Sequence, residues 1–274
     1  MKRVLGLVGI YGLLLIVVVA AIGPTLWVML SSFKPSTQIL DPESSVVPDP
    51  FTLQGYRDVF TEVHLHKYLL NTFIYAAGGT LGAMTTALLA AYPTARLRFP
   101  FRGAFTVAFS VALAIPIIGL IVPEFFIMRH LHLFDTRIGL VIFYSAMFFP
   151  ISFVILRAFL AGLPYEIEEA AIMDGAGYFT IIRRIIVPLA MPGLVTVAVL
   201  VFIFIWNEYF FAQLFTLSFD NFNIQLTLAQ FRSAFERNTT GALAGATLAM
   251  LVPIAAFLCL QRFVVSGLTA GSSK

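Results

Sequence analysis

The feature that most constrains the fold of this chain is a series of long apolar segments. Six of them occur, at about residues 4–30, 68–95, 105–128, 138–159, 185–211 and 242–263. Each is long enough to cross the hydrocarbon of a bilayer as an α-helix, which needs about 20 residues. Within lipid every backbone polar group must be bonded internally, so a chain without the alternation of a β-barrel crosses as helices. The sequence therefore predicts an all-α, polytopic integral membrane protein with about six transmembrane helices.

The composition supports the same class. Hydrophobic residues make up 59% of the 274 residues and charged residues 11%, against roughly 45–50% and 25% in soluble domains. The net charge of +3 would suit a nucleic acid, but basic residues also accumulate in the cytoplasmic loops of membrane proteins. We therefore expect contact with membrane lipid and no nucleic acid. The first apolar segment exceeds the core of a cleavable signal peptide, about 7–15 residues, and is expected to remain as a span.

Proline and glycine interrupt several of the expected spans. These residues are Pro24, Gly78, Gly79, Pro93, Pro116, Pro123, Pro150, Pro192 and Pro253. Membrane helices tolerate them where neighbouring helices satisfy the freed backbone groups. Kinks of a transport pathway and ordinary helix packing both use such residues, and the sequence leaves the two roles open.

The basic residues indicate how the spans are oriented. With the N-terminus inside, the cytoplasmic ones are Lys2, Arg3, Arg96, Arg98, Arg102, Arg157, Arg183, Arg184, Arg262 and Lys274. The outer ones are Lys34, Arg57, Lys67, Arg129, Arg137, Arg232 and Arg237. Cytoplasmic loops carry the excess of Lys and Arg in multi-pass proteins. Both termini are therefore expected in the cytoplasm.

A polar stretch between the fourth and fifth apolar segments departs from this pattern, and we call it the acidic loop (residues 164–184). Pro164 suits the first turn of a helix. Three glutamates follow near the positive end of the helix dipole, namely Glu166, Glu168 and Glu169. Gly175 supplies a permissive stop, and a second helical run is expected over residues 178–187. Small residues let another surface approach the backbone, so the loop is suited to docking.

Part of this loop follows a fixed spacing of Glu-Ala-Ala, three residues, Gly, nine residues, Ile, one residue and Val-Pro. The matching residues are Glu169, Ala170, Ala171, Gly175, Ile185 and Pro188, with Asp174 in the same stretch. The pattern resembles the EAA loop of the permease subunits of binding-protein-dependent ABC importers, which usually have Leu in place of Val187. The resemblance implies that the acidic loop is the cytoplasmic coupling loop. The alternative is an ordinary loop that is acidic for solubility.

Further features resemble the carbohydrate-uptake branch of these permeases, the maltose-type inner-membrane components. They are residues 31–35, Asn71-Thr72, Ala91-Tyr92, residues 96–102, residues 206–208 and the tail at 266–271. The resemblance implies the ABC importer type I permease fold, as a single transmembrane domain over residues 1–274 with its core at about 67–265. It places the chain in a prokaryotic inner (plasma) membrane. The implied partners are a second homologous permease subunit, two cytoplasmic ATPase subunits and an extracytoplasmic solute-binding protein, with no cofactor on this chain.

Four residues are candidates for lining the solute path: Asn71, Trp206, Asn207 and Glu208. The last three offer an aromatic surface, an amide and a carboxylate, which suit sugar hydroxyls. A charge at the centre of a bilayer costs about 2.5–3.5 kcal/mol on insertion scales, so there Glu208 would face a cavity or a partner. Alternatively, Glu208 lies near the outer headgroups, where its charge costs little. Glu124, the other acid near an apolar segment, has no counterpart in the family pattern.

Two other classes of function compete with the importer. An ion-coupled secondary transporter needs ionisable or coordinating groups near the midplane and usually inverted repeats, and the sequence shows neither clearly. A membrane enzyme needs a catalytic constellation, and none is present. The sequence also lacks the GxxxxGK[ST] phosphate loop, so ATP hydrolysis is expected on partner subunits. His64 and His66 fall short of the three or four ligands of a metal site.

Overall fold

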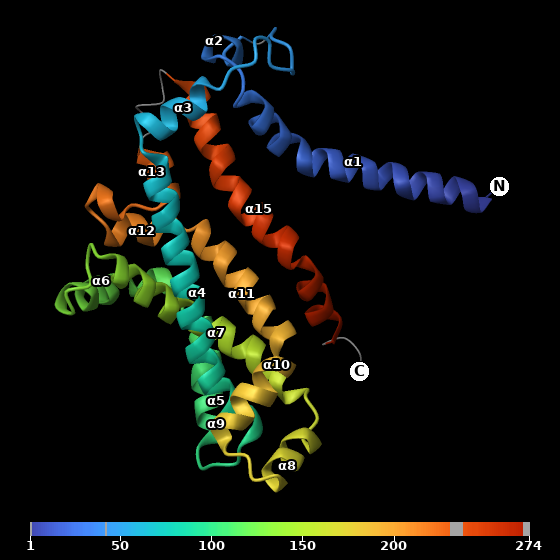
Figure 1. Ribbon diagram of the computed structural model, residues 1–274, viewed down its shortest axis with the longest axis vertical. Helices are drawn as coiled ribbons and strands as arrows, with labels where there is room; N and C mark the ends of the chain where they lie inside the picture. Colours follow the sequence, from blue (N-terminus) through green and yellow to red (C-terminus); the bar gives the residue numbers. More distant parts are fainter. Residues whose placement is uncertain (1, 42, 231–237, 271–274) are drawn as a thin grey trace. The chain divides into compact units, whose positions relative to one another are not determined.

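The computed structural model describes residues 2–41, 43–230 and 238–270 (Figure 1). Within these ranges the regular structure is helical, without strands. The chain divides into two compact units, residues 1–67 with 227–252 and residues 68–226 with 253–274. Of the residues that entered the charge comparison, Arg232, Arg237 and Lys274 lie outside the described residues. A single permease domain over residues 1–274 stays a prediction.

The all-α prediction is confirmed, and the described residues contain enough apolar helices for the predicted spans. Four helical stretches are long and apolar enough to cross a membrane, namely Gly9–Ser31, Leu65–Arg96, Arg137–Ala161 and Thr239–Gln261. Two further stretches are bent pairs, Arg102–Ala114 with Ile117–His130 and Tyr178–Leu189 with Met191–Trp206. The total is six where each bent pair forms one span.

The first unit contains α1 (Lys2–Ser31), α2 (Ser36–Ile39), α3 (Gln54–Thr61) and the first part of α15 (Thr239–Ala270). In this unit α3 packs closely on the start of α15, because a Cβ added at Gly55 would lie 2.6 Å from the carbonyl oxygen of Thr240. The side chain of Asn238 donates to Asp58 at 2.6 Å. The hydroxyl of Thr240 donates to the carbonyl of Lys34 at 2.7 Å. The loop between the first two spans is thus tied to α15.

The second unit carries the acidic loop. It contains most of α4 (Leu65–Arg96), α5 (Arg102–Val111), α6 (Ile121–His130), α7 (Arg137–Ala161), α8 (Glu166–Met173), α9 (Tyr178–Ile181), α10 (Val187–Leu189), α11 (Met191–Trp206), α12 (Phe210–Phe215) and the start of α13 (Ile224–Gln230). Short helical turns at Ala112–Ala114, Ile117–Leu120, Ile182–Ile186 and Phe219–Asn221 connect them. Figure 1 shows α8 at the same end of this unit as α9.

Close packing of α4 on α7 and α11 forms the core of the second unit. A Cβ added at Gly79 would lie 2.8 Å from Ile205 and 2.9 Å from Tyr144. One added at Gly82 would overlap the hydroxyl of Ser145. Small residues let membrane helices approach each other at such distances. The glycines in this expected span therefore serve packing, and α4 continues through them without interruption.

The third and fifth expected spans are each broken rather than continuous. Arg102–Ala114 and Ile117–His130 meet at 95°. Ile115 is extended there, with ψ 120°, as expected for a residue before a proline, here Pro116. The fifth expected span bends by 73° between Leu189 and Met191. α11 then ends at Trp206, before the end of the apolar stretch at residue 211.

Candidate functional site

The acidic loop folds as two helical segments joined by a glycine turn. α8 has the three predicted glutamates in its first turn, where the positive end of the helix dipole favours a carboxylate. The expected position of Pro164 in this turn is wrong, because Tyr165 is the N-cap residue and the helix begins at Glu166. The carbonyl group of Pro164 instead accepts a hydrogen bond from Arg96.

Gly175 ends α8 in the way that the sequence predicts. Its φ is +79°, in the left-handed region that glycine adopts without steric cost. The N–H of Gly175 donates to Ile172 at 2.9 Å, and the N–H of Ala176 donates to Ala171 at 3.0 Å. These two bonds satisfy the last carbonyls of the helix as a Schellman motif. The chain then leaves α8 and enters α9 at Tyr178.

A buried ion pair joins α8 to the C-terminal end of α4. Arg96 Nε lies 2.5 Å from Glu168 Oε1, and the two side chains are 1% and 9% exposed. The hydroxyl of Tyr92 donates to the other oxygen of Glu168 at 3.1 Å. Arg96 is in the last turn of α4 and Glu168 in the first turn of α8. Each charge therefore lies at the end of its helix where the dipole stabilises it.

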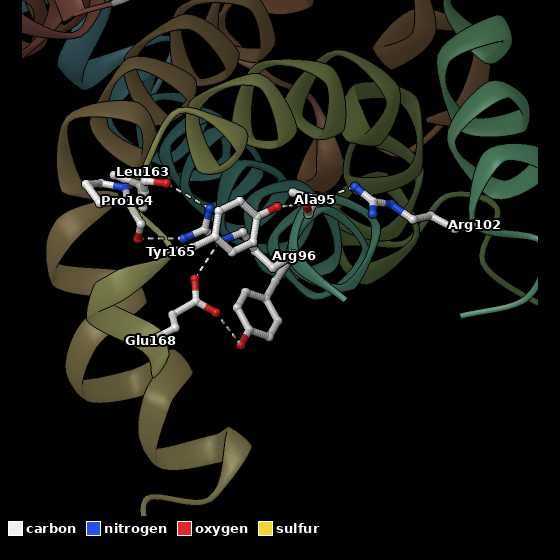
Figure 2. A network of polar contacts seen from close by, with 8 residues as sticks. Ala95, Arg96, Arg102, Leu163, Pro164, Tyr165 and Glu168 are labelled. Atoms are coloured by element: carbon white, nitrogen blue, oxygen red, sulfur yellow. Dashed lines mark hydrogen bonds and ion pairs between the residues drawn. The ribbon is translucent and has the colours of Figure 1, made fainter. Parts of the chain in front are cut away.

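The other donors of Arg96 hold the turn that leads into α8, as Figure 2 shows. Nη1 donates to the carbonyl of Leu163 at 2.8 Å and Nη2 to that of Pro164 at 2.9 Å. The Tyr165 ring centroid lies 3.9 Å from Cζ of Arg96, a cation–π distance. All three guanidinium nitrogens have a partner, as a buried charge requires. We call this set the Arg96 network: Tyr92, Arg96, Tyr165, Glu168 and the carbonyls of Leu163 and Pro164.

Two side chains also close the end of α4. The Tyr165 hydroxyl donates to the carbonyl of Ala95 at 3.2 Å. Arg102 donates to the carbonyls of Thr94 and Ala95 at 2.8 and 3.0 Å, and Figure 2 shows it reaching Ala95 from the side opposite Tyr165. The last carbonyls of a helix have no partner within it. The final turn of α4 is therefore held by bonds from outside.

The exposed surface of the acidic loop combines large apolar side chains with carboxylates. Met173 and Phe179 are 87% and 75% exposed. Ile172, Tyr178, Glu169 and Asp174 are exposed as well. Gathered on one segment, exposed large apolar side chains mark an interaction surface. A Cβ added at Gly175 or Gly177 would meet nothing within 4 Å, so space is open around the glycine turn.

The predicted motif residues occupy different environments within the loop. Ala171 is buried, one turn along the same helix face as Glu168, whereas Ala170 and Pro188 are exposed and Ile185 is half-buried. Pro188 lies within the helical run Tyr178–Leu189, where a proline ring clashes with the carbonyl four residues earlier. The run widens into a π-helical turn at Ile182–Ile186 immediately before it. This wider turn accommodates the proline without ending the helix.

The structure does not bring the side chains of residues 206–208 to one surface. Trp206 is buried and stacks on Phe202 at 5.7 Å between ring centroids. Asn207 is exposed, and its amide donates to the carbonyl of Ile203 at 2.8 Å. Their contact with a solute stays a prediction.

The carboxylate of Glu208 is engaged at the start of α12. It accepts from the backbone N–H groups of Phe211 and Ala212 at 2.8 and 3.0 Å. The hydroxyl of Tyr144 donates to it at 2.6 Å. The charge is thus stabilised by a helix N-terminus and a tyrosine. Glu208 therefore has partners within the chain, one of the two situations expected of it inside the bilayer, and its contact with a solute stays a prediction.

Asn71 belongs to a polar network at the N-terminal end of α4. Its amide donates to the carbonyls of Asp220 and Phe222 at 2.8 and 2.9 Å. The carboxylate of Asp135 holds the same segment by accepting from the backbone of Leu217 and Ser218 at 3.0 Å each. Partial burial of Asp135 opposes ionisation, but these bonds and those from the side chains of Ser218 and Asn221 outweigh it and lower its pKa. Asn71 therefore anchors the segment after α12.

The Arg96–Glu168 pair and the Asp135 network were not predicted from the sequence. Arg96 was expected as a cytoplasmic cation and as part of the stretch 96–102 that resembles the carbohydrate-uptake branch, and Glu168 as one of three acids in a first helical turn. Glu168 lies three residues before the buried Ala171, so both occupy the same helix face, but Glu169 has the same spacing to Ile172, so the sequence does not distinguish the two acids. The chain position of Asp135, between two apolar segments, carries no comparable indication.

Comparisons with known proteins show which family the chain is similar to. The model of the family described as binding-protein-dependent transport system inner membrane component matches residues 79–269. The trehalose transport system permease protein SugB of Mycobacterium tuberculosis is 36% identical, over 94% of both chains. The diacetylchitobiose uptake system permease protein NgcG of Streptomyces coelicolor is 30% identical over 96% of this chain and 88% of its own. The trehalose/maltose transport system permease protein MalG of Thermococcus litoralis is 30% identical over 100% and 98%.

A solved structure supports the fold. A chain of a bacterial ABC transporter involved in the import of the acidic polysaccharide alginate superposes with a TM-score of 0.82 at 23% identity, covering 96% of each chain. The two chains share a fold.

Proposed function

Because this chain belongs to the family of binding-protein-dependent transport system inner membrane components, we propose that it is a permease subunit of an ATP-driven ABC importer. The substrate is a sugar, an oligosaccharide or a related polyol. The names of the relatives support this class, since they refer to trehalose, diacetylchitobiose and maltose. The chain lies in a prokaryotic inner membrane with both termini in the cytoplasm.

The observation that carries the proposal is the construction of the acidic loop. Its exposed surface presents Met173, Phe179 and the carboxylate of Glu169, while a buried ion pair fixes α8 to α4. A surface of this kind suits a cleft in a cytoplasmic ATPase subunit. Burying an apolar side chain of this size contributes about 1.5–3 kcal/mol, and a hydrogen bond to a charged group about 1.5–3 kcal/mol. A few such contacts suffice for docking.

The mechanism follows from differential binding. ATP closes a pair of ATPase subunits, and the cleft that holds the acidic loop moves with them. The spans of this chain and of a second, homologous permease subunit then change from inward-open to outward-open. An extracytoplasmic binding protein releases its solute into the exposed cavity. ATP drives the change only to the extent that the ATPase cleft binds the loop differently in the two states.

The candidates for lining the solute path are Asn71, Trp206, Asn207 and Glu208. The exposed amide of Asn207 is the most available of the four, because Asn71 and Trp206 are buried and Glu208 is half-buried. An exposed amide both donates and accepts hydrogen bonds, as recognition of a hydroxyl group requires.

A charge reversal at Glu169 tests the docking role. The chain is purified with its ATPase and permease partners, returned to lipid vesicles and assayed for ATP hydrolysis stimulated by binding protein loaded with trehalose, maltose or diacetylchitobiose. We expect Glu169→Lys to lower stimulated hydrolysis at least tenfold, since a lost charged contact of about 1.5–3 kcal/mol exceeds the 1.4 kcal/mol of a tenfold change. Recovery of the ATPase with the chain should fall too.

Glu166→Lys is the matched control, because Glu166 is also an exposed acid of the first turn of α8 but lies outside the motif. It should keep most of the stimulation. Full stimulation in Glu169→Lys would contradict docking through this carboxylate.

A further inference from the structure

The two sides of α8 are connected to the rest of the second unit in different ways. On one side, Glu168 and the turn before α8 make four hydrogen bonds with Arg96 and Tyr92, over 2.5–3.1 Å. Charged groups at these distances and at this burial separate only at a large cost, because each would leave the other unpaired. α8 and the C-terminal end of α4 are thus joined rigidly.

On its other side α8 continues through a turn that contains two glycines. Gly175 and Gly177 have open space around them. Among the described residues, no side-chain hydrogen bond or ion pair joins residues 174–181 to α8. Glycine has the widest range of backbone conformations. The path from α8 to α11 also contains the π-helical turn at Ile182–Ile186 and the 73° bend before Met191. This connection is therefore the more deformable one.

We infer that Arg96 and Glu168 are positioning residues that make α8 and α4 move as one body. The inference rests on the proposed function, because it requires the ATPase to displace the acidic loop. When the ATPase displaces the acidic loop, the span formed by α4 moves with it. The glycine turn and the bend absorb the change of angle between α8 and α11. Hinge motions of this kind are localised in a few loop or element-terminal residues.

Two pairs of spin labels test this division, with ATP as the probe. One pair joins Ile167 on α8 to Leu81 on α4, and the second joins Ile167 to Phe204 on α11; all three side chains are exposed, and none belongs to the docking surface. Distances are measured in the purified complex with its ATPase subunits, without nucleotide and after ATP with vanadate. We expect the distance from Ile167 to Leu81 to stay unchanged and that from Ile167 to Phe204 to shift. A shift in the first distance of the unsubstituted chain would overturn the inference.

Substitution of Glu168 tests the cause. In Glu168→Ala the distribution of distances from Ile167 to Leu81 should broaden and change with nucleotide, and stimulated ATP hydrolysis should fall at least about tenfold. Glu166→Ala removes an exposed acid from the same turn, and its distances should match those of the unsubstituted chain. In Glu168→Gln the amide oxygen still accepts from Arg96, so the distance should stay narrow with partial hydrolysis.

The outcomes distinguish this inference from the proposed function. A narrow, unchanged distance from Ile167 to Leu81 in Glu168→Ala would show that the pair does not hold the helices together. If Glu168→Ala does not assemble, Arg96→Lys decides. A lysine lacks the planar fork with which Arg96 bonds Glu168 and the carbonyls of Leu163 and Pro164 together, so the distance should broaden, and a narrow, unchanged distance overturns the inference. Loss of ATPase recovery in Glu168→Gln would assign the pair to building the docking surface alone, which also overturns it. Absence of any ATP-dependent shift in the unsubstituted complex would instead contradict the proposed function.

Discussion

Gly175 offers the sharpest test of how the acidic loop works. Its φ of +79° is a conformation that costs an L-residue about 1–2 kcal/mol. Nothing lies within 4 Å of an added Cβ, so within this chain Gly175→Val is opposed by backbone strain and not by a clash. A cost of 1–2 kcal/mol changes an equilibrium by about 5- to 30-fold. We therefore expect Gly175→Val to lower solute-stimulated ATP hydrolysis at least fivefold, with the chain still in the membrane.

Two further substitutions separate strain from crowding by the partner. Gly177→Val adds the same side chain into equally open space, but Gly177 has φ −72° and ψ 158°, which any residue adopts. It should keep most of the stimulated hydrolysis. Asparagine tolerates the left-handed region, so Gly175→Asn should give an intermediate value.

The assay measures hydrolysis in vesicles, together with the amount of chain in the membrane and its recovery with the ATPase. Full stimulation in Gly175→Val would refute the requirement for a left-handed turn. Equal losses in Gly175→Asn and Gly175→Val would show that a close partner surface, and not strain, excludes a side chain.

Further predictions concern the solute path, the outer segment and the topology. Asn207→Ala should raise the KM of solute uptake at unchanged Tm. Glu208→Gln should lower the Tm, because an amide cannot accept all the bonds of the carboxylate and the deficit costs about 1–3 kcal/mol. The pKa of Asp135 is lowered below 3.8 in the folded protein. The stabilisation that this carboxylate gives to residues 216–223 is therefore complete above the pKa of the unfolded chain, and it is lost as the pH falls through the pKa of the folded protein. The protection of these amides against hydrogen exchange, taken relative to the intrinsic exchange rate at each pH, should fall in acid, and Asp135→Asn should remove this pH dependence. In a cysteine-free background, Ser45→Cys should react with an impermeant thiol reagent on intact cells and Thr180→Cys should not. Labelling of both would contradict the orientation that places the acidic loop in the cytoplasm.

The positions of the spans could be predicted from the sequence because apolar length is a local property. The positions of the bends could not. Pro93 and Pro150 lie inside continuous helices, whereas Pro116 lies at a 95° bend. All three follow apolar residues in expected spans. What differs is the packing of neighbouring helices, which either satisfies the freed backbone groups or leaves the chain to turn.

The same contrast applies to the acidic loop. The ends of α8 follow from local chemistry, since acids favour the first turn and Gly175 the last. The inward position of Glu168 does not follow from local chemistry, because Glu166 and Glu169 in the same turn have the same charge and the same helix propensity. Only the position of Arg96 at the end of α4 distinguishes them, and that position depends on how α4, α7 and α8 come together. A pair separated by 72 residues has no local pattern in the sequence.

The fixed interval between Gly175 and Pro188 has a backbone explanation in this structure. Moving the glycine would place a side chain at φ +79°, at a cost of about 1–2 kcal/mol. Moving the proline would separate it from the π-helical turn at Ile182–Ile186, and its ring would then meet the carbonyl four residues earlier, at about 3 kcal/mol or more. Each end of the interval is thus held by its own conformational cost. The residues between them have no comparable backbone cost. These two costs therefore account for a motif that specifies Gly and Pro and leaves the intervening positions nearly free.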